Sequence, residues 1–267
     1  MKIVSSRATI PPETHPIKEM NTMNRTARRR SSLIVTLAAV FTLLASVPAR
    51  AASPELEKVL RQMDAASARF QSAQADFRWE QYTKIVDSTD TQSGTIYFKR
   101  TGATAATTQM AAQIRQLNGQ PDAKSLTYKS GSLQLYQPRI NQLTLFSAGS
   151  NRDQFESFLT LGFGGSGTDL QNAWDVTFAG YETLKDGSQS IQTAHLALVS
   201  KQASVRNMFI RIDIWVDPAR GVTLKQFFTE PDGDSRTAYY SNVRTNSPID
   251  MQVFNIKPAP GYTTVRH

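Results

Sequence analysis

The sequence predicts an α+β fold that is mainly β, in which an antiparallel sheet closes toward a barrel. A helix-start signal stands near residue 53, and the apolar period changes from helical to alternating near residue 75. Beyond that point, short alternating segments follow one another, separated by turns rich in Gly, Pro and Asp. Such a series is typical of antiparallel sandwiches and barrels.

Residues 1–51 are expected to form a signal peptide. Three arginines, 28–30, precede an apolar run over residues 33–47, and an Ala-x-Ala site at 49–51 follows it. The run is shorter than the roughly 20 residues that a membrane-spanning helix needs. We therefore expect cleavage after Ala51 and export from the cytoplasm, in preference to an uncleaved anchor.

The true translation start is expected at Met20 or Met23, because the residues before them lack signal-peptide character. Residues 52–267 would then form a single domain, which is long enough for one sizeable core.

The positive charge of the chain is concentrated in the leader. The whole sequence has 30 basic and 22 acidic residues, and residues 1–51 hold eight of the basic and two of the acidic ones. The other 216 residues therefore keep 22 basic and 20 acidic side chains. A nucleic-acid-binding domain needs a basic face, so we expect no nucleic-acid partner.

The residue types that most enzymes use are scarce. The chain has no cysteine, which excludes disulfides, thiolate metal sites, a cysteine nucleophile and a lipid-anchored cysteine. Beyond the leader it has only His195 and His267, which supply a catalytic triad or a zinc site poorly. We expect no catalytic residues, no metal, no cofactor and a soluble monomer.

The first predicted element is a helix that begins at Pro54. Ser53 is a favourable N-cap, Pro54 suits the first helical position, and Glu55 lies in the first turn. Apolar residues follow at helical spacing and give the helix one apolar face: Leu56, Val59, Leu60, Met63 and Phe70.

Strands are predicted from the alternation that follows. Phe77 and Trp79 alternate with charged residues, and Ile96 and Phe98 alternate with polar ones. Further predicted strands are Leu126–Tyr128, Leu133–Tyr136, Gln142–Phe146, Trp174–Tyr181, Thr193–Val199, Phe209–Val216, Val222–Thr229, Arg236–Val243 and Asp250–Ile256. Residues 102–124, rich in Thr, Ala and Gln, are expected to form a loop or a short helix.

One helix is predicted to interrupt the strands, over Asp153–Phe163. Its aromatic and aliphatic residues fall on one face, and a glycine cluster follows at residues 162–167. This pattern fits a flap with a hinge, and equally an ordinary packed helix with a flexible exit loop.

Two local motifs are not expected to carry function. Residues 162–167 match G-x-G-x-x-G, but a helix is expected before them and a strand after them, which is the wrong context for a dinucleotide. Asp232-Gly233-Asp234 is typical of a hairpin turn rather than of a calcium site.

Carboxylate and serine chemistry finds little support in the pattern. Asp213 and Asp217 are expected at outward strand positions, where solvated carboxylates are the default. Ser166 and Ser188 have no evident base. A spatial carboxylate pair stays open, because sequence does not show it.

Arg100 is the residue that favours a ligand-binding role. By the period of two it shares a face with Ile96 and Phe98, so it points toward the apolar side. A guanidinium in that position needs backbone carbonyls or a ligand as partners. The alternative is that the strand ends at Lys99 and Arg100 reaches solvent.

The chain resembles the outer-membrane lipoprotein carrier protein (LolA) family over most of residues 53–265. The matching segments occur in order, after a signal peptide: residues 70–77, 94–100 with Lys99-Arg100, 130–138, 221–228, 239–242, 254–258 and 260–262. In the family a proline usually follows the arginine, whereas Thr101-Gly102 stand here, and residues 102–124 look like an insertion.

The resemblance implies an incomplete antiparallel β-barrel covered by helices that form a lid over an apolar cavity. It also implies a soluble periplasmic chaperone that binds the acyl chains of lipoproteins and carries them from an inner-membrane ABC transporter to an outer-membrane acceptor. The family's arginine, which hydrogen-bonds the lid backbone, corresponds to Arg100. We expect cavity and lid to involve Arg100, Ile96, Phe98, Phe77, Trp79, Leu133, Leu135, Phe155, Phe158 and Leu159.

Two other functions are weighed against the carrier. A lipid- or lipoprotein-sensing regulator could use the same fold, although such proteins generally have an extra domain or anchor. A periplasmic enzyme acting on lipid or glycan is disfavoured by the scarcity of His and Cys.

Overall fold

The computed structural model describes residues 53–102, 107–147, 149, 158 and 161–267. The predicted signal peptide, the cleavage site and the alternative starts lie outside these ranges and stay predictions. Across the described residues, no helix has both the length and the apolar character that a membrane span requires.

In the described residues the strands form one open sheet of 12 strands, in the order β12-β6-β5-β4-β3-β2-β1-β11-β10-β9-β8-β7. Neighbouring strands are antiparallel except β12 and β6, which are parallel. The edge strands β7 and β12 do not pair, so the barrel is incomplete, as expected. The strands are β1 (Ser72–Thr83), β2 (Ser88–Arg100), β3 (Thr108–Leu117), β4 (Gln120–Lys129), β5 (Ser132–Gln137), β6 (Gln142–Ser147), β7 (Trp174–Asp186), β8 (Gln189–Ser200), β9 (Arg211–Asp217), β10 (Val222–Thr229), β11 (Ser235–Thr245) and β12 (Thr263–Arg266).

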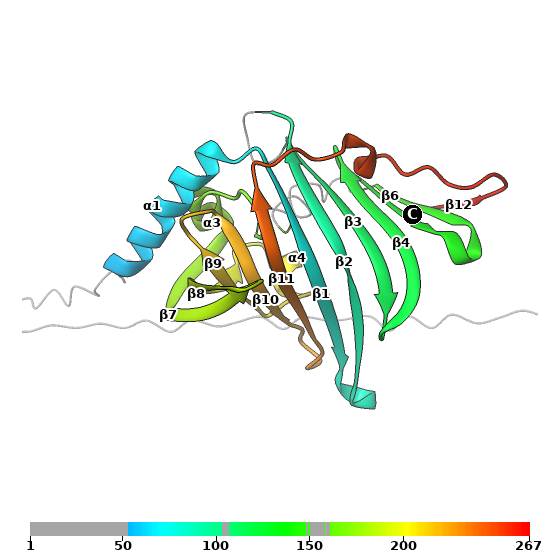
Figure 1. Cartoon of the computed structure of the whole chain (residues 1–267). Helices are drawn as coiled ribbons and strands as arrows, with labels where there is room; N and C mark the ends of the chain where they lie inside the picture. The colour runs from blue at the N-terminus through cyan, green and yellow to red at the C-terminus, as the bar shows by residue number, and fades with distance from the viewer. Residues whose placement is uncertain (1–52, 103–106, 148, 150–157, 159–160) are drawn as a thin grey trace, which may run out of the picture. The chain divides into compact units, whose positions relative to one another are not determined.

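Helices cover one part of this sheet. The α-helices are α1 (Pro54–Arg69), α3 (Gly167–Ala173) and α4 (Ala203–Arg206), and the short 3₁₀ helices are η1 (Lys84–Val86), η3 (Pro138–Ile140) and η5 (Met251–Phe254). Figure 1 shows α1 and α3 together at the side of the sheet that holds β7, β8 and β9, with β6 and β12 on the other side.

Helix α1 begins where the sequence predicts. The Ser53 side chain accepts a hydrogen bond from the Leu56 amide at 3.2 Å, and Pro54 opens the helix. The expected apolar face is buried. The helix ends at Arg69 because Phe70 adopts an extended conformation and directs the chain into β1.

Most of the predicted strands are present, and two predictions were wrong. Residues 108–117 and 120–124, expected in a loop or short helix, belong to β3 and to the first half of β4, whose second half contains the predicted strand Leu126–Tyr128. Residues 250–256 contain η5 in place of a strand, because the Asp250 side chain caps it by accepting from the Gln252 amide. The last strand, β12, was not predicted.

The core of the described residues consists of two clusters. In the first, Phe70 and Phe163 pack on residues of β1–β4, β10 and β11. In the second, the apolar face of α1 and Leu170 of α3 pack on β8 and β9, where Leu198, Ile212 and Ile214 are completely buried. In the second cluster, side chains of α1 and α3 cover the inner face of β8 and β9 completely.

Candidate functional site

Strand register places the predicted apolar residues on one concave face. Phe98 pairs with Met110, which pairs with Tyr128, which pairs with Leu133, so these side chains share a face. One step along the strands, the same register aligns another row on this face: Ile96, Ala112, Leu126 and Leu135. Because side chains alternate along a strand, Phe77 and Trp79 extend the face along β1.

The part of this face around Phe98 is covered by Phe163, which lies in the segment before α3. The Phe163 ring stacks on Phe98 with centroids 4.3 Å apart and meets Tyr240 edge-on at 5.1 Å. Its side chain is 1% exposed. The space above Phe98 is therefore occupied within the protein itself.

The segment that carries Phe163 is fixed to β10. The Thr223 amide donates to the Gly162 carbonyl at 2.8 Å, and the Gly164 amide donates to the Gly221 carbonyl at 3.0 Å. The Thr223 hydroxyl donates to the Leu161 carbonyl at 2.9 Å. These bonds attach residues 161–164 to β10 and to the residue before it. The Phe163 segment (residues 161–164) and the C-terminal end of α1 together form the cap of the concave face.

The glycines of this segment allow close packing. Gly164 has φ +76°, and an added Cβ would lie 2.3 Å from the Phe70 ring. At Gly167 an added Cβ would lie 2.3 Å from the Leu60 carbonyl oxygen of α1. In this arrangement Gly164 and Gly167 pack closely on Phe70 and α1. The helix predicted over Asp153–Phe163 lies mostly outside the described residues, and both the flap with a hinge and the packed helix with a flexible exit loop stay predictions.

Arg100 joins β2 to α1 and to the Phe163 segment. Its Nη1 donates to the Ser67 carbonyl at 2.7 Å, and its Nη2 donates to the Gly164 carbonyl at 2.5 Å. The Ser67 hydroxyl also donates to the Gly164 carbonyl, at 2.7 Å. The guanidinium lies 5.3 Å from the Phe70 ring centroid, within the range of a cation–π contact.

The Arg100 guanidinium is partly buried, and burial destabilises its charged form. Burial lowers its pKa, and the nearby Asp169 carboxylate partly offsets this effect. Its Nε is buried and has no hydrogen-bond partner among the described residues. The hydrogen-bond partners of its two Nη atoms are neutral oxygens: the carbonyls of Ser67 and Gly164 and the hydroxyl of Ser67.

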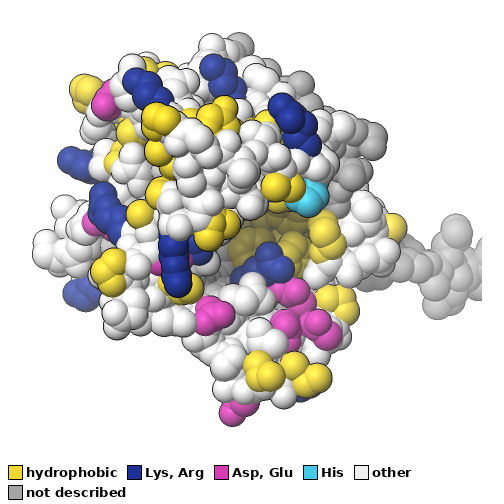
Figure 2. Space-filling model, turned by 90° about the vertical axis from the view of Figure 1, so that its right-hand side faces the viewer, with side chains coloured by type: hydrophobic (Ala, Val, Ile, Leu, Met, Phe, Trp, Pro, Cys, Tyr) yellow, Lys and Arg dark blue, Asp and Glu magenta, His cyan; other side chains and the backbone are white. Residues whose placement is uncertain are grey.

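A pocket of about 340 Å³ opens on the concave face beyond the region that Phe163 fills. Its floor includes Trp79, Ala238 and Tyr240, and its edge includes Gln81, Gln92 and Arg236. Figure 2 shows the hollow with hydrophobic side chains in its depth and charged side chains near its lower edge. This volume is within the range of small-molecule sites.

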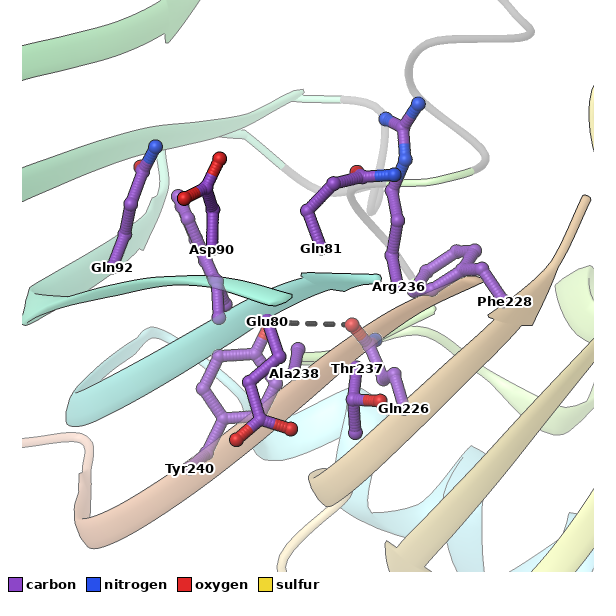
Figure 3. A pocket seen from close by; sticks show the side chains of 11 residues that line it. Glu80, Gln81, Asp90, Gln92, Gln226, Phe228, Arg236, Thr237, Ala238 and Tyr240 are labelled. Atoms are coloured by element: carbon purple, nitrogen blue, oxygen red, sulfur yellow. Dashed lines mark hydrogen bonds between the residues drawn. The ribbon is translucent and has the colours of Figure 1, made fainter. Parts of the chain in front are cut away.

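Two polar groups lie in the floor of this pocket. The Tyr240 hydroxyl donates to the Gln226 side-chain oxygen at 3.2 Å, the bond drawn in Figure 3. Gln226 is 6% exposed. Burial raises the pKa of Tyr240 to about 12, so its hydroxyl stays protonated and able to donate.

The structure brings only part of the predicted site together. Phe77, Ile96 and Phe98 are buried in the first core cluster, against which Leu133 also packs, and Trp79 lines the pocket. Phe158 lies apart from them, edge-on to Trp174 and Phe209 in the second cluster. Phe155 and Leu159 lie outside the described residues.

Sequence reasoning missed several residues of the site. Phe163 was placed on a helix face, and Tyr240, Gln226 and Phe228 were placed in strands without a role. Their alternation in β10 and β11 was visible, but only the sheet order shows that β11 lies beside β1 and that β10 follows β11.

The expectation that Asp213 and Asp217 are solvated was wrong. Asp213 is 6% exposed and binds His195 Nε2 at 2.7 Å and Arg211 through both oxygens. Asp217, also 6% exposed, accepts from Arg220 Nε at 2.6 Å. Basic and aromatic side chains cover this outer face of the sheet, so an outward position there is not an exposed one.

The motifs set aside in the sequence have structural roles. Helix α3 follows the G-x-G-x-x-G match, where a strand was expected directly, and the Ser166 hydroxyl caps it by accepting from the Asp169 amide. Asp232-Gly233-Asp234 forms a turn in which the Asp232 side chain accepts from the Asp234 amide. Within the described ranges, no group of three or more His, Asp or Glu side chains is placed to hold a metal.

No family model and no curated protein matches this chain. Among solved structures, it is similar to an uncharacterized conserved protein from Thermus thermophilus (12% identity, 80% of this chain and 99% of that chain, TM-score 0.49). It is also similar to a LolA superfamily protein from Nitrosomonas europaea (12%, 75% and 97%, TM-score 0.37). A third is the complex of Pseudomonas aeruginosa MucA and MucB (13%, 76% and 61%, TM-score 0.43). These are similarities of fold.

Proposed function

We propose that this protein is a periplasmic carrier that holds the acyl chains of lipoproteins against its concave face and passes them toward the outer membrane. The observation that carries the proposal is the Arg100 latch, which fastens the end of α1 and the Phe163 segment over an apolar sheet face. The leader and the ordered sequence motifs support the same function.

Loading requires the cap to move. In the closed form Phe163 covers Phe98, and the open pocket of about 340 Å³ lies beyond it. Acyl chains would take the place of the Phe163 ring, over Phe77, Ile96 and Phe98. Opening breaks the hydrogen bonds of Arg100 to Ser67 and Gly164 and those that the Phe163 segment makes with Thr223 and Gly221, and all of them re-form when the cavity empties.

Release must be a direct transfer to another apolar site. Each methylene removed from water contributes about 0.8 kcal/mol, so several acyl chains cannot leave into water at a useful rate. The carrier must therefore bind its cargo less tightly than the acceptor does. Polar contacts that form only in the empty state lower the net affinity for cargo, because they favour the closed form.

The donor and acceptor in this proposal are membrane proteins. An inner-membrane ABC transporter supplies the acylated lipoprotein, and an outer-membrane acceptor with an apolar site removes it. The carrier itself works as a monomer between them.

The test replaces Arg100 with leucine. Arg100→Leu should take up triacylated lipoprotein as the wild type does but release it poorly to acceptor-containing vesicles, because its empty state has lost the latch. Arg115→Leu, which changes an exposed arginine of β3, serves as the control. Cargo in the soluble and vesicle fractions is measured over time.

Three outcomes would contradict the proposal. Transfer by Arg100→Leu at the wild-type rate would remove the role of the latch. Failure of the wild type to bind any acylated species would remove the carrier. Uptake by the wild type with no transfer to any acceptor would instead fit the regulatory sensor.

A further inference from the structure

The pocket on the concave face changes from apolar to polar in one direction on three adjacent strands. Along β1 the inward residues run Phe77, Trp79, Gln81, and along β11 they run Tyr240, Ala238, Arg236. Along β2 they run from Ile96 to Gln92 and Asp90. A headgroup attached to an acyl chain that lies over the apolar end would meet these polar side chains.

The polar end contains carboxamides that lack protein partners. Gln81 and Gln92 are half-buried, and neither side chain makes a hydrogen bond within the described part of the chain. Register places Gln92 opposite Trp79 and Gln81 opposite Asp90, so the two amides are diagonal neighbours. Figure 3 shows Gln81, Gln92, Asp90, Phe228 and Arg236 projecting to one side of the sheet, and Glu80 to the other.

The charges around these amides do not favour an anion. Arg236 Nε donates to Glu230 at 2.7 Å, and Glu80 pairs with Arg78. Asp90 accepts from the neutral Asn118 side chain at 2.7 Å. Among these charged side chains, one negative charge is left over, so an anionic headgroup would meet no uncompensated cation.

We propose that this end of the pocket binds an uncharged, hydroxyl-rich headgroup, as in a glycolipid, while the acyl chain lies over Trp79 and Tyr240. This inference rests on the proposed function, because it needs the concave face to hold acyl chains. A carboxamide both donates and accepts, which matches a hydroxyl, and the apolar face of a sugar ring packs on Trp79. Leaving half-buried amides unpaired costs affinity, so the site discriminates against headgroups without hydroxyls.

The test compares three single-chain amphiphiles that share a decyl chain: decyl maltoside, decanoate and decyltrimethylammonium. Isothermal titration calorimetry measures each below its micelle concentration. Decyl maltoside should bind the wild type at least about tenfold more tightly than either charged probe. The double variant Gln81→Met/Gln92→Met should lose about tenfold for decyl maltoside and little for decanoate, because methionine keeps the volume but not the hydrogen bonds.

The control is Gln192→Met, which changes an exposed glutamine of β8 and should bind as the wild type does. Equal affinity for all three probes, or equal loss in the double variant, would overturn the headgroup inference and leave the carrier standing. Tightest binding of decyltrimethylammonium would overturn it in favour of a cationic headgroup at Asp90. Failure of every probe to bind would overturn the carrier proposal itself.

Discussion

The hydroxyl of Tyr240 shows how one buried group links the site to the stability of the fold. The residue is 6% exposed, contacts Phe163 and donates to Gln226. Burial raises its pKa from 10.0 to about 12. Because the folded state holds this proton more tightly than the unfolded state does, the neutral tyrosine contributes stability at ordinary pH.

This stability should be lost in alkali. It is fully present below about pH 10 and disappears as the pH rises toward 12, which amounts to about 2–3 kcal/mol. Urea unfolding between pH 8 and 12 measures the effect. Tyr240→Phe should flatten the decline, whereas Tyr262→Phe, at an exposed tyrosine, should leave it in place. An unchanged alkaline decline in Tyr240→Phe would contradict the assignment.

For single residues, the sequence predicts which face of the sheet a side chain lies on, but it predicts less well which other side chains surround it. Arg100 lies on the face that the period of two gives it, because β2 is regular from Ile96 to Arg100. Asp213 also lies on its expected face, but His195 and Arg211 enclose it there. Arg211 lies two residues before Asp213 on β9 and therefore shares its face. His195 comes from the neighbouring strand β8, and alternation does not encode which strands become neighbours.

At the scale of elements, the contact between α1 and the Phe163 segment depends on glycine. Gly164 and Gly119 both have φ +76°, a conformation that costs other residues about 1–2 kcal/mol. Around Gly119 nothing lies within 4 Å of an added Cβ, whereas Gly164 meets the Phe70 ring at 2.3 Å. A side chain at Gly119 would therefore meet backbone strain alone, whereas a side chain at Gly164 would meet the same strain and a steric clash with Phe70.

Replacing each glycine with alanine should show this difference. Gly119→Ala should cost only the backbone strain, and Gly164→Ala should cost about 1–3 kcal/mol more, because Phe70 must shift. Thermal and urea unfolding measure both variants. Equal destabilisation would mean that the packing beneath the cap is loose.

The elements that sequence reasoning missed have weak patterns for physical reasons. In β3, Ala111 and Ala112 stand side by side and hide the alternation that Met110 and Ile114 continue. The Asn118-Gly119 pair, both at positive φ, was the turn signal that could have revealed the β3–β4 hairpin. The segment from Asp250 alternates like a strand, but its cap turns it into η5.

At the scale of the whole molecule, the two core clusters have different roles. The second cluster holds α1 against β8 and β9, and the first cluster borders the pocket. Such a division was not predictable from sequence, because it depends on which strands become neighbours. The α+β class and the incomplete barrel, in contrast, follow from periodicity and resemblance.

Substitutions in the two regions should therefore separate stability from binding. Leu198→Ala, at a completely buried position of the second cluster, should destabilise the fold by about 2–5 kcal/mol and leave decyl maltoside affinity nearly unchanged. Trp79→Ala, in the pocket, should weaken binding several-fold and destabilise less. Urea unfolding and calorimetry measure the two effects. A large affinity loss in Leu198→Ala would contradict the division.

The three tryptophans of the chain lie in three different parts of the fold. Trp79 stacks on Phe77 in the pocket, and Trp174 is buried in the second cluster. Trp215 lies on the outer face between the His195 ring and the Lys225 ammonium. Their fluorescence therefore reports three places at once: a filling pocket changes the emission of Trp79, an opening helix layer that of Trp174, and Trp215 provides an internal reference.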